Sequence, residues 1–452
     1  MAKSTTKWVC SECSATSGGW YGKCPQCGAW NSIEQHDDAA PRDRVVLSAS
    51  ASAPVSASAQ TEEEPRVACG IAEVDRVLGG GLVPGSVVLV GGPPGIGKST
   101  LLLQAGASLA RAHGTVLYVS GEESVAQVGS RAQRLDAAAP KLLLLAETRC
   151  DRALDAAREL AIANDLAVVI IDSIQTMYSD ATDGLPGNVG QIRACAAQLV
   201  SFAKLHGVPV VLVGHVTKDG QLAGPRVLEH LVDAVLSFEG DEDRALRLLR
   251  ATKNRYGSTL ELGVFEMTGI GLREVANPSA AFLAERPSGA AGSCITASLE
   301  GSRPLLLEVQ ALLAPAYGSA RRNCVGVDPA RLAMLLAVLD RHADLGVLDQ
   351  DVFVNVAGGM RLFEPAADLA VMLAVASSHL RKPLAAGLVA LGEVGLVGEI
   401  RHAPRTDLRL GEATRLGFTR AIVADGGEPT RTAGLQITRV RTVSQAIAAA
   451  FE

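Results

Sequence analysis

Long apolar segments and an excess of basic residues are both missing from this 452-residue chain. No run of apolar residues approaches the roughly 20 positions that a membrane-spanning helix requires, so we expect no membrane contact. The opening MAKSTTKWVC has no apolar stretch after its lysines, which argues against a secretory signal and favours a cytoplasmic protein. Because the net charge is −6 at pH 7, any surface that binds nucleic acid must be local.

Cysteine is scarce outside the first 27 residues. Four of the nine cysteines fall there, and the others stand singly at positions 69, 150, 195, 294 and 324. This distribution favours a reducing compartment and one metal site over a disulfide framework. With 48% hydrophobic and 20% charged residues, the composition is that of a globular protein, long enough for roughly two to four domains.

The four N-terminal cysteines follow the pattern C-x2-C-x10-C-x2-C. They are Cys10, Cys13, Cys24 and Cys27. Two such knuckles on either side of a short loop match a tetrahedral site for Zn²⁺. A module of residues 1–35 is too small to build its own core, so metal binding would supply its folding energy. The alternative, two redox-active pairs, lacks a surrounding βαβ pattern.

Three aromatic residues, Trp20, Tyr21 and Trp30, lie within or beside these knuckles. We expect them to form the packing of the zinc module, with stacking on nucleic-acid bases as the alternative. Residues 36–64 are rich in alanine, serine, proline and acidic residues. They cannot bury enough apolar area to offset chain entropy, and we interpret them as a flexible linker.

From residue 65 to 278, apolar runs such as SVVLVGG and LAVVIIDSI alternate with helical periods such as KSTLLLQAGASLARAHG. Near-continuous apolar strands separated by helices predict a parallel α/β sheet. The runs AVLSFEG and RALRLLRATKN then predict a hairpin-like pair of strands. A third region, 279–452, contains further strand and helix patterns such as DVFVNVAGG and ADLAVMLAVASSHL.

The stretch GGPPGIGKST carries the clearest chemical signal. It reads G-x-x-x-x-G-K-S directly after the strand SVVLV and at the start of a helix, the context that a phosphate-binding loop requires and that disfavours a chance match. The backbone N–H groups around Gly95 and Gly97 would form an anion nest at the helix N-terminus. Lys98 would reach the β- and γ-phosphates of ATP, and the Ser99 hydroxyl would ligate Mg²⁺. The predicted nucleotide-binding residues are Gly92, Pro93, Pro94, Gly95, Ile96, Gly97, Lys98, Ser99 and Thr100.

Polar side chains follow three other predicted strands. Asp172 ends the buried strand LAVVIID, where it would hold the magnesium shell, although a lone acid there is usually a loop residue. Glu122 and Glu123 follow the strand TVLYVS, and either could activate water, the alternative being acids at a helix N-terminus. His215 ends VPVVLVGH and would sense the γ-phosphate, with a structural histidine as the alternative.

These motifs together resemble one family, the bacterial RadA (Sms) family of RecA-related DNA-repair ATPases. The resemblance covers essentially the whole chain. It rests on the N-terminal four-cysteine motif and on GIAEVDRVLGGGLVPGSVVLVGGPPGIGKST, YVSGEES, VVIIDSIQT, HVTKDGQLAGPRVLEHLVD and KNRYG, in that order. The family writes the last motif K-N-R-F-G, so Tyr256 is a conservative departure. The implied fold class is α/β, a RecA-like P-loop core with an N-terminal zinc ribbon and a C-terminal Lon-protease-like α+β domain.

The resemblance implies a ring, with six subunits in the family, in which each nucleotide lies at a subunit interface. Lys253 and Arg255 alternate by two at a strand end, so both can face one side and act on the ATP of a neighbouring subunit. It further implies ATP, Mg²⁺ and Zn²⁺ as cofactors, single-stranded and branched DNA as ligands, and a RecA recombinase as partner. Arg193, Lys218 and Arg226 are the expected DNA phosphate contacts, although Arg226 could equally form a salt bridge.

The C-terminal region resembles the proteolytic domain of Lon through VNVAGGMRLFEPAADLAVMLAVASS and VALGEVGLVGEIRHAP. Lon-type cleavage needs a serine nucleophile and a lysine base, whereas the matching positions hold Ala366 and fall near Asp407. We therefore expect an assembly platform without peptidase activity. Its arginines would bind duplex DNA, with solvated or inter-subunit charges as the alternative; they are Arg321, Arg322, Arg361, Arg401 and Arg405.

Three functions remain to be weighed. The first is a helicase-like, ring-forming ATPase motor, stimulated by single-stranded DNA, that drives branch migration and heteroduplex extension in recombinational repair. The second is an ATP-switched, KaiC-like scaffold or regulator without translocation. The zinc module and the K-N-R motif favour the first. The third, ATP-dependent proteolysis, is disfavoured by the missing serine and lysine. The expected domains are 1–35, 36–64, 65–278 and 279–452.

Overall fold

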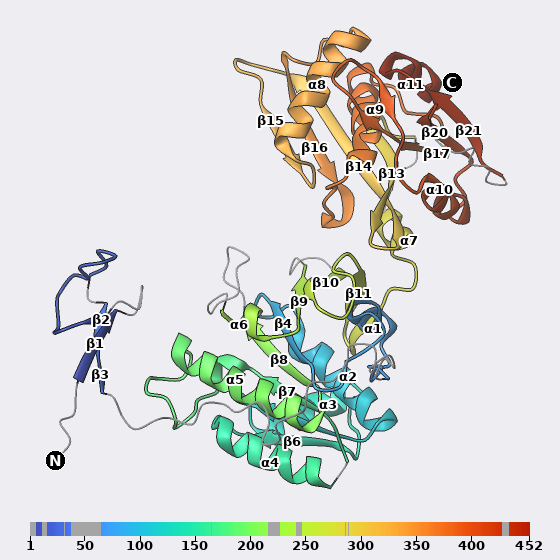
Figure 1. Cartoon of the computed structure of the whole chain (residues 1–452). Coiled ribbons are helices and arrows are strands. Elements are labelled where there is room, and N and C mark those ends of the chain that lie inside the picture. The colour runs from blue at the N-terminus through green and yellow to red at the C-terminus, as the bar shows by residue number, and fades with distance from the viewer. Residues whose placement is uncertain are drawn as a thin grey trace, which may run out of the picture. The chain divides into compact units, whose positions relative to one another are not determined.

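The computed structural model describes residues 6–10, 16–30, 32–37, 65–163, 165–215, 227–240, 246–284, 286–287, 289–426 and 434–452. The chain divides into two compact units, Met1–Gln60 and Thr61–Glu452, and each is considered by itself (Figure 1). Among the described residues, no helix is both long and apolar enough to span a bilayer.

The N-terminal unit contains a small antiparallel sheet among its described residues. Its strands are β1 (Thr6–Cys10), β2 (Thr16–Ser17) and β3 (Ile33–Asp37), in the order β2-β1-β3. An isolated bridge between Lys23 and Trp30 closes the turn that carries the second pair of cysteines. Apart from the partly buried Trp8, the described core of this unit is Cys10, Cys24 and Ile33.

The second unit begins with the predicted parallel sheet, in the described order β12-β11-β10-β9-β4-β8-β7-β5-β6. The parallel strands are β4 (Val87–Gly92), β5 (Thr115–Ser120), β6 (Leu142–Ala146), β7 (Leu166–Asp172), β8 (Val210–His215) and β9 (Ala234–Glu239). Three antiparallel strands extend it, β10 (Leu246–Asn254), β11 (Leu262–Thr268) and β12 (Gly271–Glu274). The predicted pair AVLSFEG and RALRLLRATKN forms β9 and β10.

Helices cover both faces of this sheet, which is why its strands are apolar throughout. Successive residues of β4 point to opposite faces, so Val88 and Val90 join one core while Val87 and Leu89 join the other. The first core is closed by α1 (Ala72–Leu78), α2 (Lys98–Ala112) and α3 (Val125–Arg134). The second is closed by α4 (Cys150–Ile162), α5 (Val189–His206) and α6 (Val227–Leu231), beside the 3₁₀ turn η2 (Ile174–Thr176).

The C-terminal part is an α+β domain around a mixed sheet, in the described order β15-β16-β14-β13-β17-β20-β21. These strands are β13 (Ser293–Glu300), β14 (Arg303–Pro315), β15 (Arg322–Val325), β16 (Gln350–Val356), β17 (Leu388–Leu391), β20 (Arg420–Ala424) and β21 (Gln436–Val440). A separate ribbon pairs β18 (Glu393–Val394) with β19 (Ile400–Arg401). The helical segments are α7 (Pro278–Leu283), α8 (Pro329–Ala343), η3 (Ala357–Gly359), η4 (Pro365–Ala367), α9 (Asp368–Leu380), α10 (Thr406–Arg415) and α11 (Val443–Ala450).

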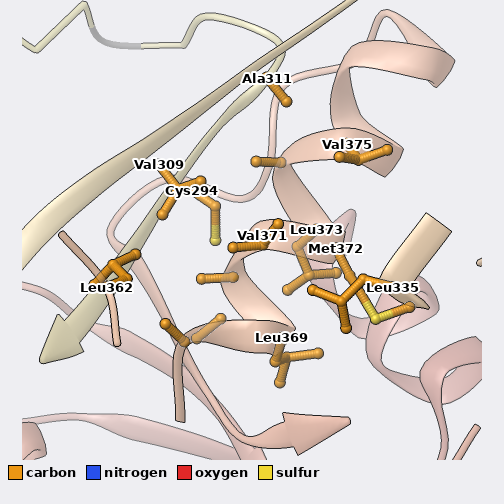
Figure 2. Packing of buried hydrophobic residues seen from close by; sticks show 14 of the residues in the cluster. Cys294, Val309, Ala311, Leu335, Leu362, Leu369, Val371, Met372, Leu373 and Val375 are labelled. Carbon is orange, nitrogen blue, oxygen red and sulfur yellow. The ribbon is translucent and has the colours of Figure 1, made fainter. Parts of the chain in front are cut away.

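Helix α9 is the centre of the C-terminal core. Every residue from Asp368 to Ser377 is buried, as expected for a helix that is apolar on all sides. Figure 2 shows Val371 beside Cys294 and Val309 of the sheet, while Leu335 of α8 lies on the other side of α9.

Candidate functional site

The predicted phosphate-binding loop joins β4 to α2 at the carboxyl end of the parallel strands (Figure 1). Gly95 and Gly97 have φ angles of 77° and 112°, a region that favours glycine. A Cβ atom on Gly97 would lie 2.7 Å from the Cε atom of Met267. The loop conformation therefore needs glycine at this position, and its backbone N–H groups gather at the N-terminus of α2.

Lys98 is buried in this loop, with 5% of its surface exposed. Its Nζ donates to the carbonyl oxygens of Gly92 at 2.8 Å and Pro93 at 2.9 Å. Burial lowers the pKa of Lys98, and the carboxylates of Asp172 and Glu122 partly oppose this shift. A cation held between acids and loop carbonyls is positioned to exchange those carbonyls for phosphate oxygens.

Asp172 ends β7 in register with Ser120 at the end of β5. The hydroxyl of Tyr118, which is 1% exposed, donates to Oδ2 of Asp172 at 2.5 Å. Burial and then the Asp172 charge raise the pKa of Tyr118 far above its ordinary value, so the phenol keeps its proton and fixes one carboxylate oxygen. The sequence prediction missed Tyr118, whose signal was a hydroxyl-bearing residue inside an apolar strand.

The two glutamates that the sequence could not separate have different partners. Glu122 accepts a 2.8 Å hydrogen bond from the Ser173 hydroxyl, next to Asp172, and it influences Lys98 electrostatically. Glu123 instead pairs with Arg131 of α3. Glu122 is therefore turned toward the phosphate loop, while Glu123, which precedes α3, is paired with the last turn of that helix.

His215 ends β8 directly beside Gly92 in the strand register. Its backbone therefore lies at the same edge of the sheet as the phosphate loop, although its side chain is outside the described part of the chain. The phosphate loop, Asp172, Glu122 and the His215 backbone thus lie at one end of the parallel strands. This end of the sheet is called the loop edge below.

The K-N-R-Y-G motif lies elsewhere, against the turn between α6 and β9. Nζ of Lys253 donates to the carbonyl oxygens of Glu229 at 2.6 Å and Val232 at 2.7 Å. Arg255 pairs with Asp233 at 3.1 Å and keeps 57% of its side chain exposed. Burial, followed by the charge of Arg255, lowers the pKa of Lys253. Both cations therefore share one location.

Asp233 organises this location and was missed by the sequence prediction. It is 2% exposed, and its Oδ2 accepts from the backbone N–H of Val87 at 3.0 Å. Nζ of Lys204 lies 3.2 Å from the same oxygen, while Nη1 of Arg255 donates a hydrogen bond to Oδ1 of Asp233. A buried carboxylate needs such partners, and the only sequence signal was an acid directly before the apolar strand AVLSFE.

Strand register places this motif away from the phosphate loop of its own chain. Lys253 pairs with Val235, which pairs with Leu89 of β4. The backbone N–H of Arg255 bonds to Asp233, whose own N–H bonds to Val87. Val87 and Gly92 are the two ends of β4, separated by roughly 16 Å at the usual rise per strand residue. The motif and the loop therefore occupy opposite edges of the sheet.

Only one of the three predicted DNA contacts can be placed. Arg193 is exposed on α5, and Lys218 and Arg226 lie outside the described residues. The loop before α5 is held by the buried Gln191, which accepts from the Ser179 N–H at 2.8 Å and donates to the Gly184 carbonyl at 3.3 Å. This loop is therefore tied down at the start of the helix that carries Arg193.

Three of the four predicted zinc ligands are brought together. The sulfur atoms of Cys10, Cys24 and Cys27 lie within 4.8 Å of one another, and those of Cys10 and Cys27 are 3.6 Å apart. Backbone hydrogen bonds from Cys27 and Gln26 lower the pKa of Cys24, which favours the thiolate that binds metal. The donor set fits Zn²⁺; Cys13 lies outside the described residues.

The expected packing role of the three aromatic residues is wrong. Trp20, Tyr21 and Trp30 are 58%, 53% and 73% exposed. The partly buried Trp8 packs against the cysteine cluster instead. The cysteines themselves form the centre of this module, so the other rings are left at the surface.

The C-terminal domain places Ala366 in η4, 3% exposed, and Asp407 in the first turn of α10. Beside them, the guanidinium of Arg409 makes bonds of 2.5 and 2.6 Å to the Glu364 carboxylate. Arg409 is 1% exposed and also donates to the Ala297 carbonyl. An ion pair between the buried Arg409 and the partly exposed Glu364 thus joins the start of η4 to α10, near the two positions that match the Lon dyad.

The five arginines proposed to bind duplex DNA differ in their partners. Arg321 pairs with Asp351 at 2.8 Å. Arg401 pairs with Glu399 at 2.5 Å. Arg405 donates to a backbone carbonyl, whereas Arg322 and Arg361 form no ion pair with any residue that the structure describes. Three of these five arginines therefore already form hydrogen bonds or ion pairs within the chain.

Known proteins match this chain along its length. A family model described as an AAA domain matches residues 54–221, and one described as a rubredoxin metal binding domain matches residues 8–35. DNA repair protein RadA of Bacillus subtilis (strain 168) is 47% identical over 459 residues, covering 99% of both chains. RadA of Pseudomonas aeruginosa (PAO1) is 50% identical over 458 residues, covering all of both chains. RadA of Escherichia coli (K12) is 47% identical over 459 residues, covering 99% of both.

These matches and the strand order confirm the predicted fold class: a RecA-like P-loop core, an N-terminal zinc ribbon and a C-terminal Lon-like α+β domain.

Proposed function

This chain belongs to the RadA family of DNA repair proteins, and from that membership we propose that it is a ring-forming motor stimulated by single-stranded DNA. The family and the AAA domain match establish the coarser statement, an ATPase of DNA repair and recombination. The motor would promote branch migration and extend heteroduplex in recombination intermediates. Its substrates would be single-stranded and branched DNA, and its partner a RecA-type recombinase.

The loop edge supports a specific division of labour for ATP hydrolysis. The N–H groups of the loop and Lys98 would hold the β- and γ-phosphates, while Ser99 and Asp172 would hold Mg²⁺, which neutralises charge developing on the phosphates. Tyr118 fixes the orientation of Asp172. Glu122 would take the proton from the attacking water, because it faces Lys98 while Glu123 is engaged with Arg131. His215 would sense the γ-phosphate.

The separation of the two sheet edges is the single observation that carries the ring proposal. A transition state for phosphoryl transfer needs cations around the transferred group. Lys253 and Arg255 lie at the edge opposite their own loop, beyond the reach of one extended side chain. In a head-to-tail ring, each subunit would present this edge to the loop edge of its neighbour, and hydrolysis would then be coupled to subunit movement.

DNA contacts are proposed for Arg193, Lys218 and Arg226 at the inner side of a ring of six subunits. Phosphate contacts of this kind give affinity that falls steeply with salt and depends little on sequence. The zinc module would hold Zn²⁺ through Cys10, Cys13, Cys24 and Cys27. We propose no peptidase activity, because Ala366 lacks a nucleophile and Asp407 lacks a basic amine.

The switch-like scaffold shares the same loop edge and makes one different prediction. A scaffold would hydrolyse ATP without moving a DNA junction. The direct test therefore measures ATP turnover with and without single-stranded DNA, together with extension of a labelled heteroduplex by wild type and Lys98→Ala. The motor predicts DNA-stimulated turnover and extension, both lost in the variant. Stimulated turnover without any extension would favour the scaffold, and turnover retained by Lys98→Ala would contradict the loop assignment.

A further inference from the structure

We propose that the zinc module carries a stacking platform for unpaired bases, formed by Trp20, Tyr21 and Trp30 with the ammonium of Lys23. This inference rests on the proposed function in one respect, that the protein meets single-stranded DNA. It assigns the contact to side chains of the N-terminal unit, which lie outside the ATPase core.

Exposure of the rings is the first observation. Trp20, Tyr21 and Trp30 keep 58%, 53% and 73% of their surfaces exposed. Aromatic side chains normally bury roughly 150–250 Å² each, so these three rings leave an unusual amount of flat apolar surface exposed. Among described residues, none of these rings contacts another ring, so each can accept a partner on its own.

The second observation is the turn that presents Trp30. The backbone N–H of Cys24 bonds to the Ala29 carbonyl at 2.8 Å, and the N–H of Gly28 bonds back to Cys24 at 2.9 Å. The bridge between Lys23 and Trp30 then closes the turn. The turn also carries Cys24 and Cys27, two of the cysteines that would bind Zn²⁺, so the backbone beside Trp30 would need little further ordering to bind a partner.

Charge around the rings selects the partner. Nζ of Lys23 lies 5.5 Å from the centroid of the Trp30 ring. Residues 13–33 contain this one lysine and no aspartate, glutamate or arginine, in a chain whose net charge is −6. A phosphate backbone beside Trp30 would therefore meet a cation, and none of these residues would repel it, while the ring stacks on a base.

The kind of apolar surface also favours bases over a protein partner. Residues 13–32 contain no leucine, isoleucine, valine, methionine or phenylalanine, so the three rings are the large apolar groups of this stretch. Flat rings separated by glycines and small polar residues suit planar bases, which all offer a π-face, and such stacking tolerates any sequence.

Tryptophan emission provides a direct test, because the three tryptophans of the chain are Trp8, Trp20 and Trp30. Fluorescence of the full-length protein therefore reports on the zinc module alone. We expect oligo(dT) of roughly 20 nucleotides to quench this emission without ATP, and a duplex of equal length to quench it little. The double variant Trp20→Ala/Trp30→Ala should lose affinity for the oligonucleotide by roughly ten-fold per ring in an anisotropy titration.

Two controls keep folding separate from stacking. Trp8→Phe should keep the quenching, because Trp8 packs on the cysteine cluster. Trp20→Phe/Trp30→Phe keeps a ring at each position and should retain most of the affinity. Zinc content, measured for every variant, identifies one in which the module has collapsed.

The outcomes separate this inference from the proposed function. If anisotropy shows oligonucleotide binding while the emission stays constant, or if the double alanine variant retains zinc and binds as wild type, the platform is refuted and the motor is untouched. If a RecA-type recombinase changes the emission and oligo(dT) does not, the rings dock protein and the inference fails. If the wild type binds no oligonucleotide in anisotropy, the proposed function fails with it.

Discussion

Mixing two inactive variants tests the placement of Lys253 most sharply. Lys98→Ala removes the loop lysine and leaves the opposite edge intact, while Lys253→Ala does the reverse. The register of β10, β9 and β4 puts Arg255 level with Val87 and the loop beyond Gly92, roughly 16 Å along the strand. Under the proposed function, a subunit would not complete its own site, and a neighbour would supply the cations.

The expected size of the effect follows from this geometry. In an equimolar mixture that assembles at random into head-to-tail rings, about one quarter of the interfaces combine an intact loop with an intact Lys253. We therefore expect each variant alone to be inactive and the mixture to recover up to about one quarter of the wild-type, DNA-stimulated turnover. The assay is ATP hydrolysis at fixed total protein across a series of mixing ratios, with a maximum at the equimolar point.

A matched control mixes two variants that are both altered at the loop edge. Lys98→Ala and Glu122→Gln both alter the loop edge of the same subunit, so their mixture contains no complete site and should recover nothing. Asp233→Asn should behave like Lys253→Ala, because it loosens Arg255 and not the loop. If the Lys98→Ala and Lys253→Ala mixture recovers nothing despite confirmed co-assembly, or if Lys253→Ala alone keeps full turnover, the reasoning from opposite edges is wrong.

Three further predictions concern the other sites. Glu122→Gln should lower turnover by about 10²–10⁴-fold, the usual share of a general base, whereas Glu123→Gln should mainly lower the melting temperature by releasing α3; equal losses of turnover would contradict the assignment. Tyr118→Phe should raise the Mg²⁺ concentration needed for tight ADP binding, because a hydrogen bond to charged Asp172 contributes about 1.5–3 kcal/mol; an unchanged Mg²⁺ titration by fluorescent ADP would refute its positioning role. Cys24→Ser should lower bound zinc measured by metal analysis, and unchanged metal content would remove Cys24 from the site.

Signals contiguous in the sequence predicted the features that depend on local conformation. The G-x-x-x-x-G-K-S pattern predicted the loop between β4 and α2, because its glycines and the following helix start suffice to build an anion nest. Continuous apolar runs predicted parallel strands covered on both faces. The cysteine spacing predicted a cluster, three members of which meet in the described structure.

Features that depend on distant partners were not accessible from the sequence. Glu122 and Glu123 are neighbours of one residue type, and they differ only through Ser173 and Arg131. The bond from Tyr118 to Asp172 spans 54 positions. The hydrogen bond from the Val87 N–H to Asp233 spans 146 positions. The aromatic residues of the zinc module were predicted to pack because residue type suggests burial, but a unit with so few core residues has no interior to receive them.

By itself, the sequence determined the chemistry that this protein has: a phosphate loop, strand-end acids, a cysteine cluster and a pair of cations in K-N-R-Y-G. Local backbone preferences and side-chain types encode these directly. Only the tertiary structure decided where they lie relative to one another, because the order β10-β9-β4-β8-β7-β5 is set by packing between segments far apart in the chain. That order separates the cations from their own loop, and the proposal that they act on a neighbouring subunit rests on this separation.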